Sequence, residues 1–107
     1  MKALVYTQPN EVQLQERALP ELVQGEVVLK IEAVGICGSD MHAWHGHDPR
    51  RKPGLVLGHE FVGRIEQSAA PGYAVGTRFT GNPLITCGVC DYCAQGRNNL
   101  CANRTMV

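Results

Sequence analysis

The chain has 107 residues, 44% hydrophobic and 19% charged, a composition typical of one globular domain with a modest core. Ten basic residues balance ten acidic ones, which disfavours nucleic-acid binding, and no apolar run approaches the ~18 residues needed to cross a membrane. The start, MKALVYTQPN, lacks the apolar core and cleavage site of a signal peptide. We therefore expect a cytoplasmic, reducing environment, where the five cysteines are more typical of metal ligands than of disulfides.

The first third of the chain predicts three strands. The apolar run 1–7 and the alternating residues 12–15 are separated by turn residues at Pro9-Asn10. Residues 26–34 give the clearest strand, because they are rich in β-branched side chains and alternate toward their C-terminal half.

The middle of the chain predicts a short helix followed by a loop. Residues 37–45 lack β-branched side chains and are expected to form one or two helical turns, capped by Ser39 or Asp40. The segment 47–53 is charged and contains two prolines, which predicts a loop. Its basic triplet, residues 50–52, is typical of a solvated surface, with phosphate binding as the alternative.

The second half predicts two further strands and a segment without a core. Residues 55–66 alternate loosely around Gly58 and Gly63, as in a buried strand with bulges. A strand is also expected at 75–80. The segment 87–101 has no apolar periodicity, so something other than a hydrophobic core must order it.

Four cysteines gather in that segment, CGVCDYCAQGRNNLC, with the spacing C-x2-C-x2-C-x7-C; we call residues 87–101 the cysteine lobe. Disulfides would form tight loops and leave an odd thiol, and the [4Fe–4S] pattern of ferredoxins has a three-residue last gap followed by proline. Zinc fits better than either alternative, because four thiolates complete its tetrahedron. The predicted ligands of this structural zinc are Cys87, Cys90, Cys93 and Cys101.

A closed four-thiolate site orders the chain but performs no chemistry, so the lobe alone suits a binding module as well as an enzyme. A second candidate site combines GICGSDMH (35–42) with GHE (58–60), where Cys37 and His59 each lie beside a glycine near a strand end. Taken separately, the cysteine is more typical of a core thiol and the histidine of a packed or solvated imidazole.

Taken in order, GICGSDMH, GHEFVG and CGVCDYCAQGRNNLC resemble the zinc-dependent medium-chain alcohol/polyol dehydrogenases over nearly the whole chain. The resemblance implies a mostly β fold, a GroES-like, partly open β-barrel with short helices and a structural-zinc lobe. It also implies NAD or NADP as cofactor, held by a separate coenzyme (Rossmann) domain. Thr77 departs from the usual Asp, at a turn with no catalytic role.

The resemblance implies a catalytic zinc held by Cys37 and His59, with Glu60 beside the metal, binding it directly or through water. Asp40 would orient His59, as metal-bound imidazoles generally require. This pair is an incomplete ligand set, because the third ligand of the family lies beyond the cysteine lobe.

The implied reaction oxidises a secondary alcohol or polyol to a ketone through a zinc-bound alkoxide, with hydride transfer to the nicotinamide. Ser39 would receive the proton of the substrate hydroxyl, and His42 would pass it to solvent. The chemistry also follows from the residue types, since zinc with an open position acts as a Lewis acid on an alcohol.

No G-x-G-x-x-G fingerprint occurs in the sequence. We therefore expect residues 1–107 to be the N-terminal part of a GroES-like catalytic domain, inactive alone, with exposed sheet edges that favour self-association. Two alternatives remain: a free-standing zinc-binding GroES-like interaction module without catalysis, and a cochaperonin, which leaves the cysteines unexplained.

Overall fold

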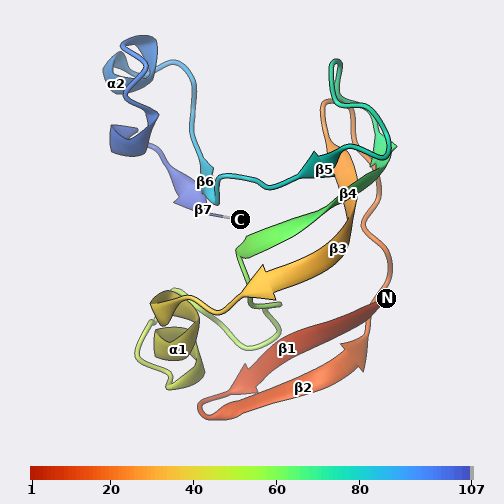
Figure 1. Ribbon diagram of the computed structural model, residues 1–107. Helices are drawn as coiled ribbons and strands as arrows, with labels where there is room; N and C mark the ends of the chain where they lie inside the picture. Colours follow the sequence, from red (N-terminus) through yellow and green to blue (C-terminus); the bar gives the residue numbers. More distant parts are fainter. Residues whose placement is uncertain (107) are drawn as a thin grey trace.

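The computed structural model describes residues 1–106 and contains three small antiparallel sheets and two short helices (Figure 1). The strand orders are β1-β2, β3-β4-β5 and β6-β7. A single bridge between Val5 and Val56 connects the first sheet to the segment that precedes β4. The sheets follow one another around a partly open barrel, and the cysteine lobe extends from its C-terminal end. The mostly β fold expected from the sequence is confirmed.

The first sheet is a hairpin of β1 (Lys2–Gln8) and β2 (Glu11–Glu16), as predicted. Asn10 takes the left-handed conformation that its tight turn requires, with φ of 65°. The alternation of β1 buries Ala3 and Val5 and leaves Leu4 half-exposed on the other face. This places one face of the hairpin against the rest of the barrel.

The central sheet pairs β3 (Val27–Gly35) with β4 (Glu60–Ser68), and β4 with the short β5 (Arg78–Phe79). The strand predicted at 55–66 was placed too early, because the ladder begins only at Glu60. Gly58 explains the difference: its φ of 104° lies outside strand geometry and interrupts the extended chain just before His59. The strand predicted at 75–80 is confirmed only over β5.

The helix expected after β3 is α1 (Gly38–Trp44), but its predicted cap was wrong. Cys37 occupies the N-cap position, rather than Ser39 or Asp40. Asp40 lies one turn inside the helix, where its Oδ2 accepts the backbone N–H of Cys37 at 3.0 Å. This bond satisfies a donor that the helix start would otherwise leave unpaired, and it fixes Cys37 relative to the helix.

Two strands that the sequence did not indicate bracket the cysteine lobe. The pair β6 (Leu84–Ile85) and β7 (Thr105–Met106) closes the base of the lobe, which contains α2 (Asp91–Ala94) and a 3₁₀ turn (Asn98–Leu100). Each strand has only two residues, too few for a period to be visible in the sequence.

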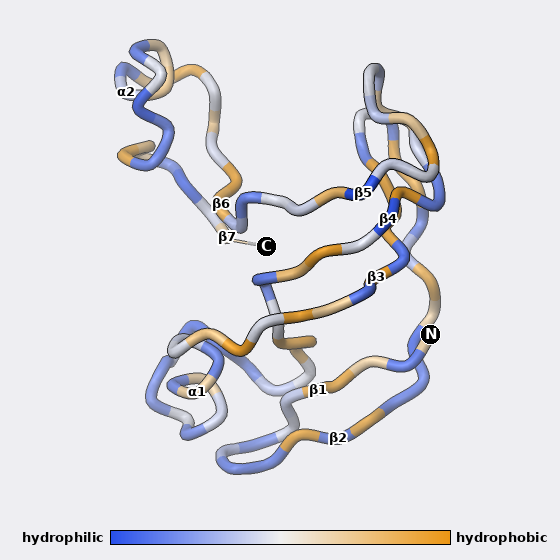
Figure 2. The backbone as a smooth tube through the Cα atoms, in the orientation of Figure 1, coloured by the Kyte–Doolittle hydropathy of each residue, from blue (hydrophilic) through white to orange (hydrophobic). Residues whose placement is uncertain are grey.

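The core is small, and its largest fully buried side chains within residues 1–106 are Ile65 of β4, Val5 of β1 and Cys101 of the cysteine lobe. Figure 2 shows apolar segments along the strands and polar segments in the turns. Several large apolar side chains stay outside the core, including Ile36 at 81% and Val89 at 85% exposure. No helix within residues 1–106 is long and apolar enough to cross a membrane.

Candidate metal centres

The thiols of the cysteine lobe converge on one point, since all four Sγ atoms lie within 4.8 Å of one another. Cys87 precedes the tight turn at Gly88, Cys90 caps α2, Cys93 lies within α2, and Cys101 follows the 3₁₀ turn. The chain returns through Gly96, whose φ of 72° lies in the left-handed region that favours glycine. All five cysteines of the protein are free thiols.

The sulfur geometry fits zinc. Cys101 Sγ lies 3.6 Å from Cys87 Sγ and 4.0 Å from Cys90 Sγ. Zn–S bonds of about 2.3 Å place neighbouring sulfurs of a regular tetrahedron about 3.8 Å apart. The same separations are far too long for a disulfide, whose sulfurs lie about 2.05 Å apart.

The backbone also supports thiolates in the lobe. The N–H of Cys90 donates to Cys87 Sγ at 3.4 Å, and the N–H of Cys87 donates to Cys101 Sγ at 3.4 Å. Backbone donors at Val89 and then Cys90 lower the pKa of Cys87 to about 6, whereas burial raises the pKa of Cys93 to about 11. Four thiolates this close repel one another, so a cation between them is what allows all four to be charged together.

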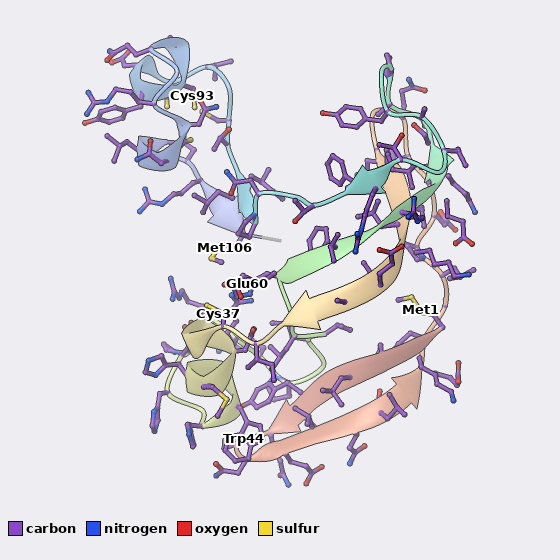
Figure 3. All side chains as sticks on the ribbon, in the orientation of Figure 1. Met1, Cys37, Trp44, Glu60, Cys93 and Met106 are labelled. Atoms are coloured by element: carbon purple, nitrogen blue, oxygen red, sulfur yellow. The ribbon has the colours of Figure 1, made fainter. Side chains whose placement is uncertain are left out.

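The second centre lies where β3 ends and β4 begins, and it brings together Cys37, His59 and Glu60 with ligand atoms within 4.8 Å of one another. The strand register explains the convergence, because Gly35 pairs with Glu60. A Cβ at Gly35 would stand 2.9 Å from Glu60 Oε2, so a larger residue at position 35 would displace this carboxylate from its present place. In Figure 3 the labelled Cys37 and Glu60 side chains lie together beside α1, and Cys93 lies in the separate lobe.

Asp40 and His59 form the buried part of this centre, at 8% and 6% exposure. Asp40 Oδ1 lies 3.4 Å from His59 Nδ1, without the geometry of a hydrogen bond. His59 Nδ1 is the one buried side-chain nitrogen or oxygen among residues 1–106 that lacks a hydrogen-bond partner. Leaving such an atom unpaired is costly, and Asp40 is placed to pair with it after a small ring rotation.

The other imidazole nitrogen, His59 Nε2, lies 3.5 Å from Ser39 Oγ. Ser39 and His42 are three residues apart on α1 and therefore share one face of the helix. Both line a pocket of about 340 Å³, together with His47, Asp48, Pro49 and Arg50. A hydroxyl and an imidazole thus adjoin the second centre in an open pocket.

Residues 23–107 match the family model described as the alcohol dehydrogenase GroES-like domain. The chain belongs to this family. It is 39% identical to the starvation-sensing protein RspB of Escherichia coli, over 94% of this chain and 30% of RspB. It is 43% identical to an L-threonine 3-dehydrogenase of Xanthomonas oryzae, over 96% of this chain and 32% of that protein.

Solved structures of the family share the fold. Galactitol-1-phosphate dehydrogenase from Escherichia coli matches with a TM-score of 0.90 and 32% identity, over 100% of this chain and 32% of that one. Alcohol dehydrogenase TADH from Thermus sp. ATN1 matches with a TM-score of 0.82 and 36% identity, over 99% of this chain and 31% of that one. The chain therefore spans about a third of the length of these relatives, and the family and GroES-like fold expected from the sequence motifs are confirmed.

The structure brings together most of the side chains that the sequence singled out for the second centre, although their roles stay predictions. Ser39 and Asp40 both lie against His59, and His42 joins through the pocket it shares with Ser39. Sequence reasoning missed Asp48 and Arg50 as pocket residues. Their only signal was the charged, proline-containing loop after α1.

Proposed function

We propose that this chain carries the zinc-binding catalytic residues of an NAD(P)-dependent alcohol or polyol dehydrogenase that oxidises a secondary alcohol to a ketone. The observation that carries the proposal is the convergence of Cys37, His59 and Glu60 at the paired ends of β3 and β4. A thiolate, an imidazole and a carboxylate are ligands that zinc accepts. Relatives named for L-threonine and for galactitol 1-phosphate support an alcohol-bearing small molecule as substrate.

The proposal assigns the two clusters different tasks. The four thiols of the cysteine lobe would hold a structural zinc, and Cys37 and His59, with Glu60 beside them, would hold the catalytic one. When bound, that second zinc supplies Lewis acidity, which lowers the pKa of a substrate hydroxyl. Asp40 would keep His59 in the tautomer that presents Nε2 to the site.

Ser39 and His42 would handle the proton. Ser39 Oγ lies beside His59 Nε2 and is therefore close to any hydroxyl held at this centre. His42 lines the same open pocket and would take the proton from Ser39, by way of the nicotinamide ribose, and release it to solvent. NAD or NADP would be the hydride acceptor. We expect no oxidation of polyols by residues 1–107 alone, and hydride transfer above background would contradict this.

The competing function is a zinc-binding interaction module without catalysis. One observation favours it: the cysteine lobe offers a complete set of four ligands, whereas the second cluster offers three, one of them the exposed Glu60. Metal content separates the two functions. A dehydrogenase requires a metal at both clusters, and the module requires it only in the lobe.

The test is elemental analysis of the chain after zinc loading, with Cys37→Ser as the variant. We expect two zinc ions per chain, one for each cluster, and the loss of the weaker one in the variant. Ile36→Ser is the matched control, because it introduces the same side chain at a neighbouring position that is 81% exposed. If Cys37→Ser and Ile36→Ser retain the same zinc content and affinity, the second centre does not form and the module function stands.

A further inference from the structure

We propose that Arg50, Arg51 and Arg104 form a subsite for an anionic group of the substrate, a phosphate or a carboxylate. This inference rests on the proposed function, since it adds a charged end to the alcohol that the second centre would oxidise. It follows from a pocket that the metal centres do not use.

The subsite lies between the loop after α1 and the strand pair β6–β7. Its pocket has a volume of about 450 Å³, within the range of small-molecule sites. Three arginines line it together with Thr105 and three apolar residues, and no acidic residue of 1–106 lines it. The apolar lining residues are Leu55, Leu84 and Met106. Arginines and apolar residues around one pocket suit a small organic anion.

The charges of this pocket are only partly compensated. Arg50 forms two hydrogen bonds of 2.9 Å with both oxygens of Asp48, so this pair is neutral. Arg51 is only 15% exposed in its side chain, yet its single ion pair among the described residues is a 4.0 Å contact with the same carboxylate. A largely buried guanidinium is normally paired and hydrogen-bonded.

Arg104 adds a second charge, since the one hydrogen bond of its guanidinium within residues 1–106 is to the backbone carbonyl oxygen of Cys101, at 3.2 Å. Within the part of the chain that the structure describes, Arg51 and Arg104 therefore leave most of their N–H donors without a partner, and both residues line one pocket. Planar guanidinium donors match the oxygens of phosphate and carboxylate in number and geometry.

Arg50 connects this subsite to the proposed reaction site. It lines both this pocket and the pocket that contains Ser39 and His42. A substrate with a hydroxyl at one end and an anion at the other would reach both places.

The first experiment titrates the zinc-loaded chain with inorganic phosphate and follows backbone and arginine side-chain NMR signals. We expect saturable shifts centred on Arg51 and Arg104, and roughly tenfold weaker binding in Arg51→Gln. Arg17→Gln is the control, because Arg17 is exposed and does not line the pocket. Equal affinity of these two variants, or shifts centred elsewhere, would overturn the subsite.

The variant Asp48→Asn tests the subsite through an expected gain in phosphate affinity, which a misfolded protein would not show. Removing the carboxylate leaves Arg50 and Arg51 without their shared partner, so phosphate affinity should rise by roughly tenfold. A gain cannot result from a damaged fold, and unchanged or weaker binding would contradict the charge argument.

A last arm separates the subsite from the proposed function and identifies the anion. Cys37→Ser should leave phosphate binding intact, because Cys37 does not line the pocket. If it abolishes binding, phosphate is held at the metal centre and the subsite is wrong. Among hexitol 6-phosphate, hexonate and uncharged hexitol, we expect one of the two anions to bind at least tenfold tighter than the hexitol. If hexitol 6-phosphate binds more tightly than hexonate, the anionic group of the substrate is a phosphate, and if hexonate binds more tightly, the group is a carboxylate. Equal binding of all three compounds overturns the proposal.

Discussion

Removing zinc from the cysteine lobe should disorder residues 87–101 and leave the β3–β4 sheet folded. The lobe has almost no core of its own: Cys101 is its one buried residue, and Val89 is 85% exposed. Its helix α2 has four residues and its 3₁₀ turn three, both too short to be stable alone.

The energies agree with this expectation. Fixing the backbone of the fifteen residues from Cys87 to Cys101 costs about 15 kcal/mol, at about 1 kcal/mol per residue. Structural zinc contributes roughly 10–16 kcal/mol in small zinc-binding peptides at neutral pH. The stabilisation from zinc and the conformational cost of ordering the lobe are therefore of the same order of magnitude, and the lobe depends on its metal.

The assay is amide hydrogen exchange by NMR, before and after treatment with a chelator of known affinity. Amides of the lobe should lose protection and take the shifts of an unfolded chain, whereas the paired amides of β3 and β4 stay protected. Persistent protection of residues 87–101 in the metal-free chain would refute the reasoning, because it would show that contacts other than zinc order the lobe.

A pair of variants gives the same test without a chelator. Loss of a residue that only hydrogen-bonds to a metal ligand typically weakens metal binding by about 10- to 100-fold. Cys101→Ser removes a ligand itself, so it should weaken zinc binding by more than about 100-fold. Val89→Ala, an exposed change in the same lobe, should leave the affinity unchanged.

Three further predictions concern the fold and its charges. Ile65→Ala should lower the free energy of unfolding by about 2–5 kcal/mol in denaturant titrations, while the half-exposed Ile85→Ala changes it by less than about 0.5 kcal/mol. Gly63→Ala should lower the free energy of unfolding by about 2 kcal/mol or more, because the added Cβ would lie 2.5 Å from the backbone oxygen of Lys30 in β3. Asp48 should titrate at about 2 by NMR, because the Arg50 side chain lowers its pKa from 3.8. The ion pair between Asp48 and Arg50 is thus fully formed above pH 3.8 and is lost as the pH falls through about 2. Arg50→Gln should raise the pKa of Asp48 toward 3.8.

The sequence predicted the features that depend on local pattern. The alternation in 26–34 predicted β3, the spacing of four cysteines predicted the convergence of the lobe, and the absence of β-branched residues in 37–45 predicted α1. Each of these signals lies within a short window of the chain.

Features that depend on exact local geometry or on distant parts of the chain were not visible. The bond between Asp40 and the Cys37 backbone is local, but it makes Cys37 the helix cap through the geometry of one turn, which residue type alone does not specify. The pairing of β6 with β7 across the lobe brings Arg104 next to the loop that carries Arg51. No local pattern encodes such a meeting, so the triplet at 50–52 was predicted as a solvated loop.

The most direct test of a catalytic centre in this chain is ¹¹³Cd NMR of the cadmium-loaded protein. The account predicts two resonances, one shifted as for four sulfur ligands and one as for a mixed sulfur, nitrogen and oxygen set from Cys37, His59 and Glu60. Cys37→Ser should remove only the second resonance. A single four-sulfur resonance, unchanged in Cys37→Ser, would contradict the account and leave the cysteine lobe as the only metal site of residues 1–106.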